Sequence, residues 1–265
     1  MPARGAFIVI EGLDRSGKST QAATLRERLV AEGTRIELMK FPDRTTAIGQ
    51  MIDAYLRSNI EMEDHVVHLL YSANRWELVS RIYSLLAEGT TIICDRYAFS
   101  GIAFSASKVA SAPAVADAPT SATPTAASAS ASISAPSASI PASVATQTRI
   151  TPPSAANPLL PYAWCRAPDI GLPAPDVTLF FDISPEAALA RGGYGEERYE
   201  REDMQRRVRE AYARLGAEMD AERPGSWVRI DAARDMNAVA DEVWARIKTL
   251  ARGVDDPVSR LWEGM

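Results

Sequence analysis

One short segment near the start of the chain has residue types and a spacing suited to chemistry, Gly12-Leu13-Asp14-Arg15-Ser16-Gly17-Lys18-Ser19. This is the spacing G-x-x-x-x-G-K-S, in which glycines let backbone N–H groups turn towards phosphate oxygens. In such a loop Lys18 would reach the β- and γ-phosphates, and the Ser19 hydroxyl would hold Mg²⁺. Arg15 could place its guanidinium against the transferring phosphoryl group. We therefore expect the chain to bind a nucleoside triphosphate.

Charged residues also follow two of the predicted strands. Asp95 and Arg96 come directly after the strand expected at 90–94, and Arg44 follows the strand expected at 35–41. In open α/β sheets, ligands bind beyond the carboxyl ends of the strands. Asp95 is therefore placed to support Mg²⁺ through a water, and Arg96 to grip a second phosphate. Arg44 and Arg96 could converge on one anion, although Arg44 alone would also suit a surface turn.

Two further segments leave their interpretation open. Tyr71 and Arg75 lie four residues apart and share one face of a predicted helix. They could read a base by stacking and hydrogen bonding, or be a core aromatic beside an ion pair. The segment 191–201 contains three glycines and several charges, which suits a lid that closes over phosphates, or simply a flexible loop.

Apolar runs alternate with segments of helical period along most of the chain, which predicts an α/β fold with a parallel sheet and helices on both faces. We expect strands at 6–11, 35–41, 90–94, 177–183 and 227–230, and helices at 17–32, 46–58, 64–88, 98–107, 185–191, 202–221 and 236–252.

One segment departs from this order. Residues 107–157 are almost entirely Ala, Ser, Pro and Thr, with no charged residue between Asp117 and Arg149. Such a composition buries too little apolar surface to offset the entropy lost on ordering. We expect a disordered insertion in a loop, and a partner-binding or modified segment is the alternative.

The composition excludes several classes of protein. A net charge of −5 provides no basic footprint for nucleic acid. Two cysteines outside any metal-binding pattern suggest reduced thiols in the cytoplasm, or also the nucleus. The chain contains no run of 18 apolar residues, so we expect no membrane span. The segment before the first expected strand is short for a signal peptide. His65 and His68 are expected on the surface or in a groove of one helix.

Several motifs, occurring in order along the chain, resemble the thymidylate kinase (dTMP kinase) family in its eukaryotic-type form. The segments that carry this resemblance are Phe7–Gln21, Phe41–Gly49, Glu63–Glu77, Asp95–Phe104 and Trp164–Pro175, together with the lid. The resemblance implies a P-loop NTPase-like nucleoside monophosphate kinase fold, with a five-stranded parallel sheet flanked by helices. It implies a single domain over 1–265 with a small lid at 190–202, and a homodimer formed through the helix at 64–88.

The resemblance also implies a reaction, in which ATP and Mg²⁺ convert dTMP to dTDP. Arg15, Lys18, Asp95 and Arg96 would be catalytic, and Ser19 would hold Mg²⁺ together with Asp95 through a water. ATP would contact Gly12, Asp14, Arg15, Ser16, Gly17, Lys18, Ser19, Thr20 and Arg191. The acceptor dTMP would contact Asp14, Phe41, Arg44, Tyr71, Arg75, Arg96, Tyr97, Ser100, Gly101, Phe104, Tyr199 and Gln205.

Individual roles follow from the same resemblance. Asp14 would accept from the 3′-hydroxyl, Arg44 and Arg96 would hold the monophosphate, Tyr71 would stack on thymine and Arg75 would read its O4. The lid arginines Arg191, Arg198 and Arg201 leave the division of catalytic work with Arg15 open. Another nucleotide or nucleoside kinase, acting for example on dUMP or thymidine, is the nearest alternative. A nucleotide-binding module without turnover is a second.

Overall fold

The computed structural model describes residues 3–108, 160–191, 198–199 and 201–263. Residues 1–108 and 159–265 belong to one compact unit. The second unit, 109–158, lies outside the described residues, as do residues 192–197 and 200 of the predicted lid. The structure therefore tests neither the disorder expected of the insertion nor the prediction of a lid at these residues. None of the helices in the described ranges is long and apolar enough to cross a membrane.

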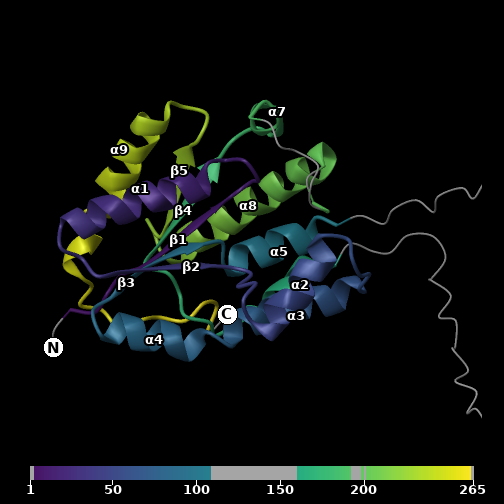
Figure 1. The fold of residues 1–265 in the computed structure, drawn as a ribbon, viewed down its shortest axis with the longest axis horizontal. Coiled ribbons are helices and arrows are strands. Elements are labelled where there is room, and N and C mark those ends of the chain that lie inside the picture. Colours follow the sequence, from purple (N-terminus) through teal and green to yellow (C-terminus); the bar gives the residue numbers. More distant parts are fainter. Residues whose placement is uncertain (1–2, 109–159, 192–197, 200, 264–265) are drawn as a thin grey trace, which may run out of the picture. The chain divides into compact units, whose positions relative to one another are not determined.

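A five-stranded parallel sheet forms the centre of the fold, in the order β2-β3-β1-β4-β5 (Figure 1). The strands are β1 (Phe7–Gly12), β2 (Ile36–Lys40), β3 (Thr91–Asp95), β4 (Val177–Asp182) and β5 (Trp227–Asp231). Every strand expected from the sequence is present, with ends that differ by one residue or less. The register pairs Asp95 with Ile10 on one side and with Lys40 on the other. The ends of β1, β2 and β3 therefore meet at one edge, where the phosphate-binding loop begins.

Helices cover the sheet, and their bounds are α1 (Lys18–Ala31), α2 (Ala47–Leu56), α3 (Asp64–Trp76), α4 (Val79–Ala87), α5 (Ala98–Ala106), α6 (Tyr162–Arg166), α7 (Pro185–Leu189), α8 (Glu202–Glu222) and α9 (Met236–Ile247). Figure 1 shows α1 beside α9, and α5 between α8 and α3. Two short 3₁₀ helices follow α6 and α9, namely η1 (Ala167–Asp169) and η2 (Leu250–Arg252). This arrangement confirms the predicted fold class.

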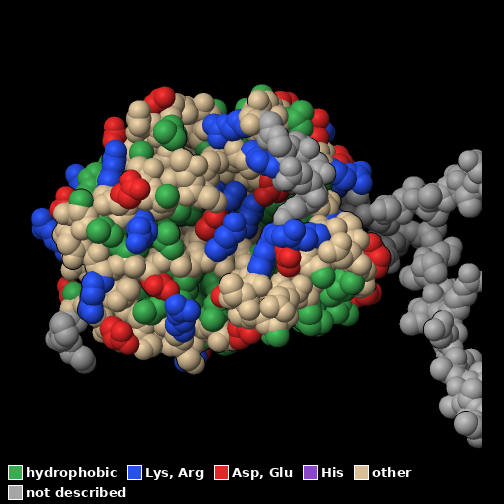
Figure 2. Space-filling model, in the orientation of Figure 1, with side chains coloured by type: hydrophobic (Ala, Val, Ile, Leu, Met, Phe, Trp, Pro, Cys, Tyr) green, Lys and Arg blue, Asp and Glu red, His purple; other side chains and the backbone are tan. Residues whose placement is uncertain are grey.

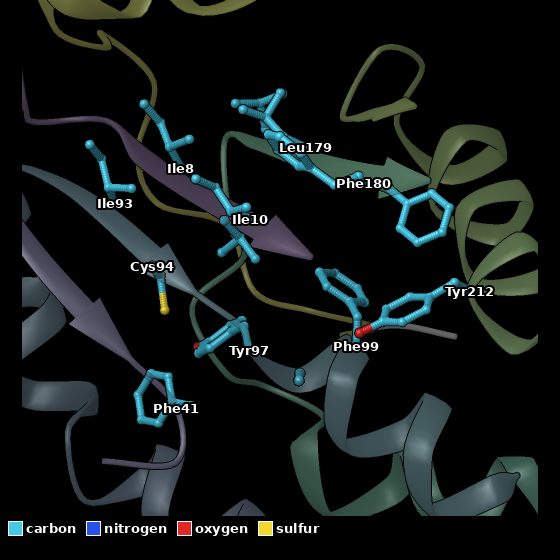
Figure 3. Packing of buried hydrophobic residues seen from close by; sticks show 14 of the residues in the cluster. Ile8, Ile10, Phe41, Ile93, Cys94, Tyr97, Phe99, Leu179, Phe180 and Tyr212 are labelled. Atoms are coloured by element: carbon cyan, nitrogen blue, oxygen red, sulfur yellow. The ribbon is translucent and has the colours of Figure 1, made fainter. Parts of the chain in front are cut away.

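The core forms on the central strands, whose apolar runs are buried on both faces, as expected for a parallel sheet covered by helices. All six residues of β1 and of β4 are buried. Figure 3 shows Ile8 of β1 beside Ile93 of β3, which are register partners. It also shows Tyr97 next to Phe41, with ring centroids 5.7 Å apart. The core therefore reaches directly to the edge of the sheet where charged residues begin.

The single helix expected at 64–88 is wrong, because the chain forms two helices, α3 and α4. The break is a tighter turn, in which Leu78 N donates to Arg75 O at 3.1 Å. An unbroken helix of this length would be about 37 Å long and would present one continuous stripe of apolar side chains. Instead α3 packs on α2, α5 and η1, while α4 buries Ile82 and Leu86 in the sheet core. The helix expected at 236–252 likewise ends at Ile247, before η2.

Candidate active site

The phosphate-binding loop joins β1 to α1 and contains three residues with positive φ, namely Gly12 (148°), Arg15 (63°) and Gly17 (90°). A Cβ on Gly12 would lie 2.5 Å from the backbone oxygen of Phe181, so only glycine fits there. Lys18 Nζ is folded back and donates to Leu13 O at 2.5 Å. Burial of this amine, reinforced by Arg96, lowers the pKa of Lys18 to about 7.

The predicted Mg²⁺ ligands lie together at the mouth of the loop. Ser19 Oγ donates to Asp95 Oδ2 at 2.8 Å. The other carboxylate oxygen, Oδ1, is buried and has no hydrogen-bond partner in the described part of the chain. Hydroxyl and carboxylate oxygens are ligands that Mg²⁺ accepts, usually with several waters retained. The residues present therefore fit Mg²⁺, although the described residues hold no cluster of three or more His, Cys, Asp or Glu that would enclose an ion.

A cavity of about 390 Å³ opens beside this loop. Its lining includes almost every residue expected to contact the acceptor: Asp14, Phe41, Arg44, Tyr71, Arg75, Arg96, Tyr97, Ser100, Gly101, Phe104 and Tyr199. Lys18, Ser19 and Asp95 line the same cavity. Figure 2 shows Lys and Arg side chains, with a few acidic ones, gathered around a hollow near the middle of one face. The size suits one small ligand next to a bound phosphate chain.

Three arginines of the cavity, Arg44, Arg75 and Arg96, each have a carboxylate partner. Arg96 pairs with Asp14, and its guanidinium lies 5.1 Å from the centre of the Phe104 ring. Although burial acts to raise it, the pKa of Asp14 is held below its usual value, chiefly by Arg96. Arg44 Nη1 lies 2.6 Å from Asp53 Oδ1. The cavity therefore contains basic groups whose charges are balanced before any anion enters.

Known proteins match most of the chain. The family model described as thymidylate kinase matches residues 10–124 and 155–243. The thymidylate kinase of Schizosaccharomyces pombe is 40% identical over 91% of this chain and 90% of its own length. The chain belongs to the thymidylate kinase family. The human thymidylate kinase is 35% identical, with 98% of both chains covered.

The solved structure of a thymidylate kinase from Candida albicans has a similar fold. Its TM-score is 0.73 at 32% identity, with 98% of this chain and 99% of that chain covered. For the Candida enzyme, that structure is said to reveal the origin of broad substrate specificity and a novel structural element. The sheet and helices described above therefore form the P-loop nucleoside monophosphate kinase fold of this family.

Residues predicted from the lid and from the ATP side lie on several different parts of the fold. Arg191 donates to Arg15 O at 3.0 Å and to Ala232 O at 2.5 Å, which ties the phosphate-binding loop to the end of β5. Arg198 instead contacts Glu61, at 2.7 Å and 2.9 Å, on the side of α2. Gln205 donates to Asp14 Oδ2 at 2.8 Å, so α8 also reaches the acceptor cavity. Thr20 lies exposed on the first turn of α1.

Three buried groups near the site were missed or misplaced from the sequence. Glu11 is fully buried and accepts from Tyr97 N at 2.9 Å and from Ser100 N at 3.1 Å, so it caps the start of α5. Its place at the end of an apolar run was a signal that could have found it. His68 is fully buried, which corrects the position on the surface or in a groove that was expected for it. Asp169, on η1, has no local sequence signal.

Proposed function

We propose that this chain transfers the γ-phosphoryl group of ATP to dTMP, giving ADP and dTDP. The observation that carries this proposal is the shared cavity. Lys18, Ser19 and Asp95 line it together with the residues assigned to the acceptor. An acceptor phosphate has a second pKa near 6, so it is already anionic at neutral pH. The protein then contributes positioning and charge neutralisation, and needs no general base.

We assign to the acceptor residues the roles that the family resemblance implies, and their shared position in the cavity supports this assignment. Arg44 and Arg96 exchange their carboxylate partners for the dTMP phosphate, and Asp14, once released from Arg96, accepts from the 3′-hydroxyl. Tyr71 stacks on the thymine ring, and Arg75 donates to O4. We assign the 5-methyl group to the apolar wall from Phe41 and Phe104, and Tyr97 to the place that a ribose 2′-hydroxyl would occupy.

On the ATP side we assign the phosphates to the loop from Gly12 to Thr20, and Arg191 to the adenine flank. Arg15 meets the transferring phosphoryl group, since the described contacts hold Arg198 at Glu61. Ser19, with Asp95 through a water, would hold Mg²⁺, which when bound neutralises charge on the phosphates. Residues 190–202 close over ATP as a lid, within a single kinase domain that the segment 107–157 interrupts.

The chain is also expected to form a homodimer through the segment 64–88, which the structure divides into α3 and α4. Val66 and Leu69 on α3 are 49% and 47% exposed, and Met51 on the neighbouring α2 is 47% exposed. Figure 2 shows apolar side chains gathered at the lower right, where Figure 1 places α2 and α3.

Both cysteines are free and buried, which supports a reducing compartment such as the cytoplasm.

An ADP-release assay over a panel of acceptors tests the proposed activity, with Lys18→Met as the control for contaminating kinases. We expect dTMP to be the best acceptor, dUMP to be about tenfold poorer because one methyl contact is lost, and ribonucleotides to be poor. Equal or better turnover of dCMP or AMP would overturn the assignment to dTMP. Preference for thymidine would indicate a nucleoside kinase, and binding without turnover would indicate a nucleotide-binding module.

A further inference from the structure

The part of the cavity assigned to the acceptor base, called here the base end, contains the arginine of a buried ion pair. Arg75 and Asp169 are 2% and 0% exposed, with Nη2 to Oδ2 at 2.6 Å and Nε to Oδ1 at 3.2 Å. Asp169 Oδ1 also accepts from Ser72 Oγ at 2.7 Å. Two parallel hydrogen bonds fix both the position and the plane of a guanidinium. Asp169 does not line the cavity, whereas Arg75 does.

The segment that carries Asp169 is itself fastened along α3. His68 Nε2 lies 2.8 Å from Cys165 O, and Trp76 Nε1 donates to Pro168 O at 2.7 Å. His68, Ser72, Arg75 and Trp76 are spaced along one side of the helix, so all of them reach this segment. The carboxylate is therefore held relative to α3 by contacts on both sides of the ion pair.

A second wall restricts the guanidinium from the side of α5. A Cβ built on Gly101 would lie 2.8 Å from Arg75 Nη2 and 3.0 Å from Nη1. Asp169 occupies the Nε and Nη2 edge, and among the described residues Nη1 has no hydrogen-bond partner. The remaining N–H donors therefore belong to the part of the guanidinium that borders the cavity.

We propose that Asp169 is a positioning and specificity-determining residue, which holds Arg75 so that its Nη1 donors meet the edge of the acceptor base. The proposal rests on the function proposed above, in which Arg75 reads O4. A guanidinium donates and never accepts. A fixed guanidinium therefore favours a base with a carbonyl oxygen at this position. It disfavours a base with an amino group there, such as cytosine, because two donors would face each other. An unfixed one would turn away from the amine and lose this discrimination.

The principal test is Asp169→Asn in the intact chain, which keeps the shape and removes the charge. We expect the KM for dTMP to rise by about tenfold to a hundredfold, with a smaller change in kcat and none in the KM for ATP. The preference for dTMP over dCMP should fall by a similar factor. Unchanged dTMP KM and unchanged base preference would overturn the proposal, and so would an equal rise in the KM for ATP, which indicates a general structural effect.

Further variants keep the test decisive if Asp169→Asn folds poorly. Ser72→Ala removes one hydrogen bond to Asp169 and leaves the ion pair, so a severalfold rise in the dTMP KM is expected. In an Arg75→Met background, Asp169→Asn should cause no further loss of base preference, because it acts only through Arg75. Additive effects would contradict that route.

Asp176→Asn serves as the matched control, since Asp176 forms a two-bond ion pair with Arg4 at 2.7 Å and 2.8 Å outside the cavity. It should leave the KM for dTMP unchanged. Failure of the unsubstituted protein to use dTMP at all would overturn the proposed function, whereas failure of these variants to alter base preference would overturn only the role of Asp169.

Discussion

The two ends of the active-site cavity are built differently. The phosphate end comes mainly from one contiguous loop, in which positive φ angles at Gly12 and Gly17 shape the backbone, with Asp95 at the end of β3 beside it. The base end joins α3, α5 and η1, and its ion pair links Arg75 to a residue 94 positions away. Phosphate binding therefore depends mainly on local backbone geometry, whereas base recognition depends on long-range packing. Substitutions at the two ends should consequently affect different kinetic constants.

The largest effect is expected at the phosphate end, from Arg15→Ala. Because the guanidinium meets charge that develops only during transfer, kcat should fall by about 10³-fold, with little change in the KM for dTMP. Steady-state kinetics with both substrates would measure it. Arg198→Ala is the comparison, and its effect on kcat should be much smaller since Arg198 contacts Glu61. The reverse order would assign catalysis to the lid.

At the base end, Gly101→Ala should raise the KM for dTMP by about tenfold while leaving kcat and the KM for ATP nearly unchanged. The new methyl group would clash with the Arg75 guanidinium, because the ion pair with Asp169 resists the shift that would relieve the contact. Alanine is favoured over glycine inside a helix, so the melting temperature should not fall in proportion. A change in both KM values would mean that the two ends are not separable.

The pKa of Lys18 predicts a proton linkage confined to the phosphate end. At pH values above about 7 the Lys18 amine loses its proton in the free protein, and bound phosphates favour the protonated amine again. Up to one proton should be taken up with ATP, and the Kd should rise by as much as about tenfold per pH unit above 7. Calorimetry in buffers of different ionisation enthalpy would measure the uptake. Lys18→Arg, which cannot lose its proton, should abolish the uptake if Lys18 is its source.

The smallest effect is expected from deletion of residues 112–155. Both flanks of this segment are held by His68, which lies 2.8 Å from Ser105 Oγ and 2.8 Å from Cys165 O. Closing a shorter loop should stabilise the fold by about 1 kcal/mol, at roughly 0.6 kcal/mol per doubling of length. Thermal unfolding and kinetics of the deletion variant would test this. Loss of folding, or protease resistance of the segment in the intact chain, would show that it packs on the kinase fold.

Much of the fold could be predicted, because apolar runs bounded by turn residues locate strands well. The error at 64–88 arose because a helical period continues through Leu78 even though the chain bends there. The helices α6 and η1 were not predicted, since their short segment is stabilised by contacts with α3 and the C-terminal residues. Among these contacts, Gly171 N donates to Leu261 O at 2.9 Å.

The sequence by itself determined the phosphate-binding loop, the positions of the strands along the chain and the family, because each strand or motif is made of residues that are close together in the chain. It also supplied the residues that line the cavity, once their motifs were compared with the family. Only the tertiary structure decided which carboxylate holds which arginine, and that Glu11, His68 and Asp169 are buried beside the cavity. Such pairings depend on distances between elements far apart in sequence, and desolvation acts only after those elements have packed.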